Sequence, residues 1–457
     1  MTHIKINNRI VGDGYPAYII AEMSANHSGS IERAKEIIRA AKVCGADCVK
    51  IQTYTPDTLT IDCHNEYFQI QNGTWEGENL YSLYGKAYTP WEWHKELKEE
   101  AERVGIDFLS TPFDNTSVDF LEELGMEFYK IASFEMVDLP LLRYIAAKGK
   151  PIIMSTGMAN KEEIEEALEA IYETGNDRVA ILKCSSAYPA ISEDMHLKTI
   201  ADMKTSFGIP VGLSDHSMGY LGATTAIALG ANIIEKHFCI SRSIENPDAS
   251  FSMEPDEFKE MVQQIRQVEK AMGKVSYGPS AQEKSSTVFR RSVFVTKDIK
   301  KGEVLTEDNV RSIRPGYGEK PKYLDDILGM QVERDIERGT PFSFDMLYKG
   351  SILFLTGDAA GRQVYGQLKD YAKSKQIYCI GNKITPELVQ KMQPGFIIIY
   401  RYKHTIPEEV LEYMQGRILN PEMDLTATQK DSCVLAEFSE VYTFFEENQD
   451  IFRCERN

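Results

Sequence analysis

Short apolar runs rich in Val, Ile and Phe recur along the first half of the chain, and amphipathic stretches with helical periodicity separate most of them. The runs are apolar at nearly every position, which is typical of strands buried on both faces of a parallel sheet. This alternation predicts an α/β fold, and eight such strand–helix units are typical of a (β/α)8 TIM barrel. A doubly wound sheet is the alternative, but no glycine-rich phosphate turn follows the first run. The predicted strands are residues 17–24, 47–54, 107–113, 128–133, 151–157, 179–186, 210–217 and 233–238.

The pattern changes after residue 280, and the change predicts further domains. Short apolar segments joined by Lys-Gly and Arg-Gly turns indicate a small β-rich domain that ends near residue 349. The runs ILFLTG, QIYCIG and FIIIYRYK then alternate with helical stretches and predict a C-terminal α/β extension, whose acidic end is weakly periodic. The expected domains are therefore residues 1–280, 281–349 and 350–457.

The segment between the second and third predicted strands, residues 55–93, is too long for a plain connecting loop. It carries the aromatic residues Trp75, Tyr81, Tyr84, Trp91 and Trp93. Two interpretations stay open: the segment folds over the barrel mouth as a lid, or its aromatic side chains pack on the barrel exterior.

Polar side chains appear at the C-terminal end of nearly every run. In a TIM barrel these ends converge on the catalytic face, so the polar ends predict a site around the barrel mouth. The residues are Glu22, Lys50, Gln52, Ser110, Thr111, Lys130, Ser133, Ser155, Thr156, Ser185, Ser186, His216 and His237.

Two of these ends carry histidine, in the sequences Ser214-Asp215-His216 and Glu235-Lys236-His237. Side chains alternate along a strand, so each histidine shares a face with the residue two positions before it. If the two runs are neighbouring parallel strands, both imidazoles can reach one metal ion. The alternative is a pair of half-buried structural histidines, but the position of both at polar strand ends favours metal ligands.

Composition limits the partners and the compartment. A net charge of −18 argues against nucleic acid and anionic membranes as partners, because both need basic surface, but it does not exclude a small anionic substrate. The chain shows neither a membrane-spanning apolar run nor a signal peptide at its start, and its 8 cysteines form no Cys-x-x-Cys pair. These features predict a cytoplasmic protein with reduced thiols.

Several stretches resemble the sialic acid synthase family, whose members condense phosphoenolpyruvate with an N-acetylated amino sugar. They occur in the family's order and are IIAEMSANHSGS, GADCVKIQTY, FLSTPFD, YKIASFE, IIMSTGM, GLSDHSMG, EKHF and then RRSVFVTKDIKKGEVLTEDNVRSIRPG. The resemblance covers residues 1–349 and implies a TIM barrel followed by an antifreeze-like (SAF) domain. Within the family, SANHSGS, QTYTPDTLT, YTPWEWH and IASFEMVDLP resemble the branch that makes pseudaminic acid. The N-acetylneuraminate and legionaminate branches, which read closer to GVNHNG and SGE, are the alternatives.

The resemblance also implies roles for individual residues. It implies a divalent metal on His216 and His237, with Mn²⁺ expected and Co²⁺ or Mg²⁺ as alternatives, and two imidazoles with open positions suit Mn²⁺ or Co²⁺ better than an all-oxygen Mg²⁺ site. Glu135 is the expected general base, and Glu22, Gln52 and Lys130 are the other expected catalytic residues. Phosphoenolpyruvate is expected on Lys50, Thr111, Lys130, Ser133, Ser155, Ser186 and Ser214. The sugar and the water are expected at Glu22, Gln52, Glu135, Tyr188, Glu235 and Asp248.

Two further implications concern the second half of the chain. Arg314 matches the arginine that the family's antifreeze-like domain inserts into the barrel of a partner subunit, so the resemblance implies a domain-swapped homodimer. Residues 350–420 resemble the start of formyltransferase-like domains, but the sequence after Asn420 lacks the His-Pro motif that formyl transfer needs. We therefore expect a docking or vestigial extension.

Two other classes of function remain as hypotheses. A non-catalytic antifreeze-like binding protein would have no use for the retained His216, His237 and Lys130. An aldolase would use Lys130 as a Schiff base, and borohydride trapping distinguishes that chemistry from a synthase.

Overall fold

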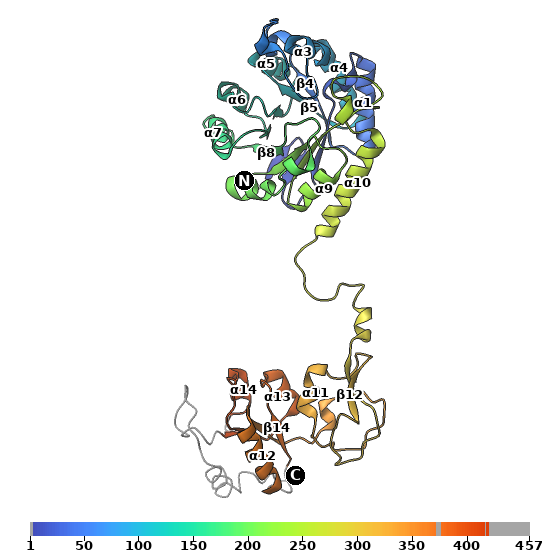
Figure 1. Ribbon diagram of the computed structural model, residues 1–457, viewed down its shortest axis with the longest axis vertical. Coiled ribbons are helices and arrows are strands. Elements are labelled where there is room, and N and C mark those ends of the chain that lie inside the picture. The colour runs from blue at the N-terminus through green and yellow to red at the C-terminus, as the bar shows by residue number, and fades with distance from the viewer. Residues whose placement is uncertain (1–2, 372–375, 416, 420–457) are drawn as a thin grey trace. The chain divides into compact units, whose positions relative to one another are not determined.

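The computed structural model describes residues 3–371, 376–415 and 417–419. The chain divides into two compact units between Val275 and Ser276, and each is described here by itself (Figure 1). None of the helices in these ranges combines the length and the apolar character needed to span a bilayer.

The first unit is built on eight parallel strands, counted within the described residues, that pair in the order β5-β4-β3-β10-β9-β8-β7-β6. The two ends of this order, β5 and β6, also lie against each other, so the sheet curls into a nearly closed barrel. Each predicted run contains one strand, which confirms the TIM barrel. The strands are β3 (Tyr18–Glu22), β4 (Cys48–Thr53), β5 (Asp107–Pro112), β6 (Tyr129–Ile131), β7 (Ile152–Ser155), β8 (Val179–Cys184), β9 (Val211–Asp215) and β10 (Ile233–His237).

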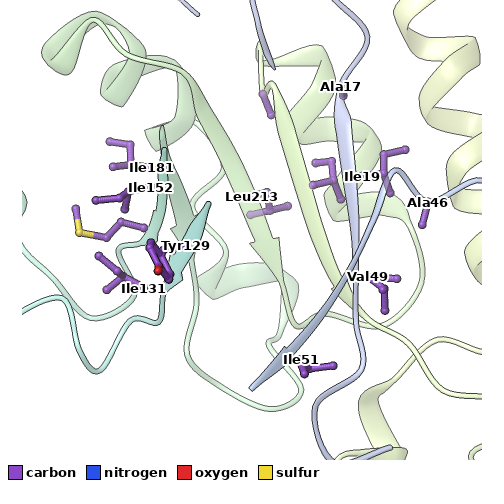
Figure 2. Close-up of a cluster of buried hydrophobic side chains, with 14 of the residues drawn as sticks. Ala17, Ile19, Ala46, Val49, Ile51, Tyr129, Ile131, Ile152, Ile181 and Leu213 are labelled. Atoms are coloured by element: carbon purple, nitrogen blue, oxygen red, sulfur yellow. The ribbon is translucent and has the colours of Figure 1, made fainter. Parts of the chain in front are cut away.

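Helices surround the barrel and bury one face against the outward side chains of the strands. Ile19 of β3, Val49 of β4 and Leu213 of β9 belong to this outer core, part of which Figure 2 shows. Burying an aliphatic side chain of this size contributes about 1.5–3 kcal/mol, so the outer core is the main source of stability for this unit. The helices are α1 (Ile31–Cys44), α4 (His94–Val104), α5 (Asn115–Glu123), α6 (Leu139–Ala146), α7 (Lys161–Tyr172), α8 (Thr199–Phe207), α9 (Leu221–Ala228) and α10 (Pro255–Met272).

An N-terminal hairpin closes the amino-terminal end of the barrel. Its strands are β1 (His3–Ile6) and β2 (Arg9–Gly12), which pair antiparallel. Ile4, Ile6 and Val11 of the hairpin belong to the same buried cluster as the inward side chains near the start of the barrel strands. The amino-terminal end of the barrel interior is therefore filled with apolar side chains, whereas a cavity opens at the carboxyl-terminal end.

The segment at residues 55–93 combines both interpretations left open by its sequence. It contains the helices α2 (Pro56–Leu59) and α3 (Leu80–Ala87). The Trp75 ring lies 5.5 Å from that of Tyr188 at the carboxyl-terminal end of the barrel, whereas Trp91 stacks on Phe120 of the outer helix α5 at 4.8 Å. The first part therefore lies over the mouth, and the last part packs on the exterior.

The second unit contains an antiparallel pair and a parallel sheet. Strands β11 (Ser292–Val295) and β12 (Val310–Ile313) pair antiparallel, and α11 (Leu324–Ile327) follows them. The parallel sheet has the order β14-β13-β15-β16. Its elements are β13 (Ile352–Leu355), α12 (Ala359–Tyr371), β14 (Ile377–Ile380), α13 (Pro386–Met392), β15 (Phe396–Ile399), α14 (Glu408–Tyr413) and β16 (Ile418–Leu419).

The two parts of the second unit share one hydrophobic core. Tyr323 and Val332, before residue 350, belong to the same buried cluster as Leu388 and Met392 of α13. The backbone N–H of Gln331 also donates to the hydroxyl of Tyr378, at 3.1 Å. The extension is therefore packed into the β-rich part and is more than an appended tail.

Short 3₁₀ helices complete the described structure. They span Ser24–His27, Glu66–Phe68, Trp91–Trp93, Ser192–Asp194, Ala249–Phe251, Ser285–Phe289, Pro321–Tyr323 and Phe344–Met346.

Candidate active site

The carboxyl-terminal end of the barrel interior carries a layer of buried polar side chains. In β3 the inward series Tyr18, Ile20 and Glu22 changes from apolar to acidic, because every second residue of a strand points into the barrel. The same change on the other strands brings most of the predicted site residues together. The other polar residues of this layer are Lys50, Gln52, Thr111, Lys130, Ser155, Ser214, Glu235 and His237, and His216 directly follows β9.

Two lysines and two glutamates form a buried charge network in this layer. Lys50 forms an ion pair with Glu22, and its Nζ lies 3.6 Å from Oε1 of Glu235. The same glutamate oxygen lies 3.9 Å from Nζ of Lys130. Burial alone would lower the pKa of Lys50, but the two carboxylates outweigh it and raise that pKa, whereas burial lowers the pKa of Lys130. The network therefore places two lysine side chains in an enclosed space of low dielectric constant, where their interaction with an anionic ligand would be stronger than in water.

Hydroxyl groups adjoin this charge network. Nζ of Lys130 donates to Oγ of Ser155 at 2.6 Å, and Oγ of Ser133 accepts from the backbone N–H of Gly157 at 3.0 Å. A Cβ atom on Gly157 would lie 2.2 Å from Oγ of Ser186 and 2.7 Å from Oγ of Ser133. Glycine at this position therefore lets both hydroxyls lie close to the backbone of residue 157. This arrangement of hydroxyls and ammonium groups suits a carboxylate or a phosphate.

His216 and His237 lie side by side, with ring centroids 5.4 Å apart. Nδ1 of His216 donates to the carbonyl of Ser185 at 2.9 Å, which leaves the lone pair of Nε2 available to a ligand. Nδ1 of His237 is buried and has no hydrogen-bond partner in the described part of the chain. Burial and the nearby His216 lower the pKa of His237, so this ring stays in the neutral form that binds metals.

The two imidazoles fit a divalent cation as a partial coordination sphere. The described residues form no group of three or more His, Cys, Asp or Glu side chains that could hold a metal. With two protein nitrogens as ligands, the other coordination positions of a cation would be open to water and substrate. The unpartnered nitrogen of His237 is the observation that favours this use over two structural histidines.

A cavity of about 530 Å³ opens from this layer toward the segment at residues 55–93. Nε1 of Trp75 donates to the carbonyl of Pro247 at 2.9 Å, so this segment is tied to the loop that carries Asp248. Its polar lining residues are Ser24, Gln52, Asn72, Glu135, His237 and Asp248. Its lining also includes the apolar and aromatic residues Tyr54, Leu59, Ile70, Leu80, Leu83, Tyr84, Ala87 and Phe113.

Glu135 is the titratable group best suited to proton transfer in this cavity. Burial raises its pKa to about 7, and its Oε2 is buried with no hydrogen-bond partner in the described ranges. A carboxylate with a pKa near the working pH is an efficient general base. Among the other acidic residues of the site, Oε1 of Glu22 accepts from Nε2 of Gln52 at 3.3 Å, and Oδ2 of Asp248 accepts from the N–H of Ala25 at 3.1 Å.

Some predicted residues lie outside this layer. Ser110 points to the opposite face of β5 from Thr111, and its hydroxyl donates to the carbonyl of Ile51 at 3.3 Å. Tyr188 lies on the loop after β8, and its ring covers that of His216 at 4.2 Å. Arg314 lies in the second unit, directly after β12, with an exposed side chain that makes no ion pair or hydrogen bond with the described residues. The first unit alone therefore does not contain every predicted site residue.

Sequence reasoning missed several residues of the site. Ser24 accepts from Nε2 of Gln52 at 2.9 Å, and Phe251 places its ring 5.0 Å from that of His237. Sγ of Cys184 lies 3.8 Å from Nδ1 of His216. Ser24 and Cys184 both stand at the ends of predicted strands, so their position was a usable signal. Phe251 gave none, because its contact with His237 is set by tertiary packing.

The chain is similar to known sugar acid synthases. It is 48% identical to a pseudaminic acid synthase of Campylobacter jejuni over 322 residues, which cover 70% of this chain and 94% of that protein. It is 37% identical to an N,N'-diacetyllegionaminic acid synthase of Legionella pneumophila, covering 72% of this chain and 94% of that one. The crystal structure of an N-acetylneuraminic acid synthetase from Leptospira borgpetersenii, in complex with citrate, matches with a TM-score of 0.56 and 32% identity over 62% of this chain and 94% of that chain.

The profile of the NeuB family matches residues 37–277, and that of the SAF domain matches residues 290–347. The fold and the site define a TIM-barrel enzyme of the sialic acid synthase type with an SAF domain. The chain belongs to the NeuB family. The resemblance seen in the sequence motifs is therefore confirmed.

Proposed function

We propose that this chain condenses phosphoenolpyruvate with 2,4-diacetamido-2,4,6-trideoxy-β-L-altropyranose to give pseudaminic acid and phosphate. The observation that carries the proposal is the 48% identity to a pseudaminic acid synthase over 94% of that protein's length. N-acetylneuraminate and legionaminate synthesis are the alternatives, and the identity to a legionaminic acid synthase is lower, at 37%.

The buried lysines and hydroxyls support phosphoenolpyruvate as one substrate. Lys50 and Lys130 would oppose the negative charge of the carboxylate and phosphate groups. The hydroxyls would orient these groups, and Glu235, whose Oε1 lies 3.6 Å from Nζ of Lys50 and 3.9 Å from Nζ of Lys130, would hold the two lysine side chains in place. The hydroxyl-bearing residues in this role are Thr111, Ser133, Ser155, Ser186 and Ser214.

The apolar lining residues of the cavity support a sugar with a methyl group at C6. The proposed sugar carries a methyl group at C6 and the methyl groups of two acetamido substituents, whereas N-acetylmannosamine has a hydroxyl at C6. Leu83 and Tyr84 of α3, together with Ile70, present apolar surface to the cavity. Burying a hydroxyl against such surface without a partner is unfavourable, and a hydrophobic pocket discriminates against it by a factor of about 10² at most.

In the proposed reaction the Glu135 carboxylate accepts a proton from water. C3 of phosphoenolpyruvate attacks the carbonyl carbon of the open-chain sugar, and the new C–C bond leaves positive character at C2. Water adds at C2 and gives one proton to the Glu135 carboxylate, and the former carbonyl oxygen of the sugar takes up one proton to become a hydroxyl. The bond between C2 and the bridging oxygen then breaks, and the second proton of the water passes to the departing phosphate as the C2 ketone forms. Glu22 and Gln52, which hydrogen-bond to each other, and Asp248 would orient the sugar and the water.

His216 and His237 would hold the divalent cation of the proposal, Mn²⁺ or alternatively Co²⁺ or Mg²⁺. When bound, the cation supplies Lewis-acid polarisation of the sugar carbonyl. The Tyr188 ring lies against His216 and would exclude water from one side of the site.

The proposal includes a homodimer in which Arg314 of one subunit completes the site of the other. The barrel mouth supports a covering partner, because apolar side chains from several of its loops are exposed there. These residues are Phe134, Val137, Met158, Ile191, Met218 and Leu221. A guanidinium offers a rigid fork of donors for the N-acyl oxygen of the sugar.

Mixed dimers test the crossed arrangement. Arg314→Ala and His237→Ala should each be nearly inactive alone, and a heterodimer of the two should recover activity because one of its sites is intact. Verified subunit exchange without recovery would contradict the crossed arm.

Isotope labelling tests the reaction. With ¹⁸O in the bridging position of phosphoenolpyruvate, the released phosphate should carry the label and the product should be a nine-carbon sugar acid. Label retained in the sugar acid would overturn the proposed bond cleavage.

A further inference from the structure

Asp215 and Lys236 are buried charged residues to which the proposed function assigns no role. Each is about 1% exposed. They point to the opposite face of β9 and β10 from Ser214 and Glu235, and so lie between the barrel wall and its outer helices. Nζ of Lys236 donates to Oδ2 of Asp215 at 2.8 Å.

This ion pair is hydrogen-bonded to Ser217, the residue that follows His216. Oδ1 of Asp215 accepts from the N–H of Ser217 at 2.9 Å and from its hydroxyl at 2.6 Å. Lys236 also donates to the carbonyl of Ser217. The residues on both sides of His216 are therefore tied to one another and to the neighbouring strand.

The pair also fixes the second histidine. Asp215 and Lys236 are partners at the end of the ladder between β9 and β10, and His237 follows Lys236 directly. Helix α9 covers the pair closely, since a Cβ atom on Gly222 would lie 3.1 Å from Oδ2 of Asp215. The ammonium and the carboxylate thus lock the two strand ends in register at the point where the imidazoles begin.

A buried ion pair of this kind is weak evidence for stability, because the desolvation of two charges offsets their attraction. We propose that Asp215 and Lys236 are positioning residues, which set the separation and orientation of His216 and His237 for a divalent cation. This proposal rests on the metal site of the proposed function. Removing groups that orient metal ligands typically weakens metal binding 10- to 100-fold.

The test uses the metal-stripped full chain and the double variant Asp215→Asn/Lys236→Met. Asn keeps an oxygen acceptor for Ser217, and Met keeps the length of the lysine side chain without its charge. We expect the double variant to remain folded and its Kd for Mn²⁺, measured by electron paramagnetic resonance of the free ion, to rise 10- to 100-fold. With Co²⁺, the visible absorption of the bound ion should change in shape, which a purely structural role would not cause.

Arg266→Met is the matched control. Arg266 forms a half-buried ion pair with Asp47 at 3.3 Å, and Asp47 precedes β4 at the amino-terminal end of the barrel. This variant should lower the melting temperature and leave the Kd for Mn²⁺ unchanged.

The outcomes separate two failures. If the wild-type chain binds no Mn²⁺ and the His237→Ala variant behaves identically, the metal site of the proposed function is wrong. If the wild type binds Mn²⁺ and the folded double variant binds it within twofold as tightly, the positioning role alone is overturned. Should the double variant not fold, Asp215→Asn is measured in its place, and a loss of folding there would make the pair a structural requirement and also overturn the proposal.

Discussion

Replacement of Glu135 by Gln should stabilise the barrel at alkaline pH while removing activity. Burial raises the pKa of Glu135 from 4.5 to about 7, so the folded chain binds this proton more tightly than the unfolded chain does. The stabilisation from this proton is complete below the unfolded pKa and is lost as the pH rises through about 7. Compared with a neutral Gln, the wild-type side chain should therefore cost roughly 3 kcal/mol at pH 8 but less than about 1 kcal/mol at pH 5.

Thermal unfolding of the metal-free chain at the two pH values measures this difference. The Glu135→Gln variant should melt several degrees above the wild type at pH 8 and close to it at pH 5, because each kcal/mol shifts the melting temperature of a unit of this size by about 2–4 °C. In the same variant kcat should fall by about 10²–10⁴, since the water loses its proton acceptor. Wild-type kcat should rise with pH through an apparent pKa near 7, and the remaining activity of the variant should lack that rise.

Two results would refute this reasoning. One is an equal difference in melting temperature at both pH values, which would mean that Glu135 does not titrate between them. The other is a wild-type kcat that rises with pH through the ordinary carboxylate pKa, or a rise of kcat near pH 7 that persists in the variant. Glu92→Gln, an exposed residue outside the cavity, is the control and should change neither property.

Three further predictions concern the metal, the lysine and the extension. His216→Ala and His237→Ala should each abolish Mn²⁺-dependent turnover and leave the melting temperature of the metal-free chain within a few degrees of wild type. Activity that persists in either variant in the presence of a chelator would contradict the metal site. Borohydride added with both substrates should give no mass adduct on Lys130, and a reduced adduct would indicate Schiff-base chemistry. Lys130→Met should raise the KM for phosphoenolpyruvate by at least about tenfold, because a buried charge-assisted contact is lost. Ending the chain at residue 349 should destabilise the SAF domain, because it exposes the apolar surface around Tyr323 and Val332 that packs on α13. Limited proteolysis should then cleave residues 290–347. Resistance to the protease equal to that of the full chain would show that the shared core is dispensable.

Much of the barrel and its site could be predicted from the sequence, because both depend on local alternation. Near-continuous apolar runs identified the eight strands, and the change to polar residues at their ends identified the layer that contains Lys50, Lys130 and Glu235. The pairing of His216 with His237 followed from two-residue spacing and the adjacency of β9 and β10. These features need no knowledge of distant contacts.

Other features could not be predicted because they arise only when distant segments meet. The N-terminal hairpin is too short to signal that it fills the barrel end. The raised pKa of Glu135 depends on burial, which its sequence neighbours do not reveal. The extension after residue 350 was expected to dock or to be vestigial, yet its shared core with the SAF domain depends on side chains such as Leu388 that read as an ordinary amphipathic helix.

The central claim is the identity of the sugar, and initial rates of phosphate release test it most directly. The full chain is supplied with Mn²⁺ and phosphoenolpyruvate and with one of three sugars: the diacetamido-trideoxy altropyranose, the corresponding legionaminate precursor or N-acetylmannosamine. The higher identity to the pseudaminic acid synthase predicts the highest kcat/KM with the altropyranose, and the apolar lining of the cavity predicts a margin of about tenfold to a hundredfold over N-acetylmannosamine. A higher kcat/KM with either of the other two sugars would contradict the assignment.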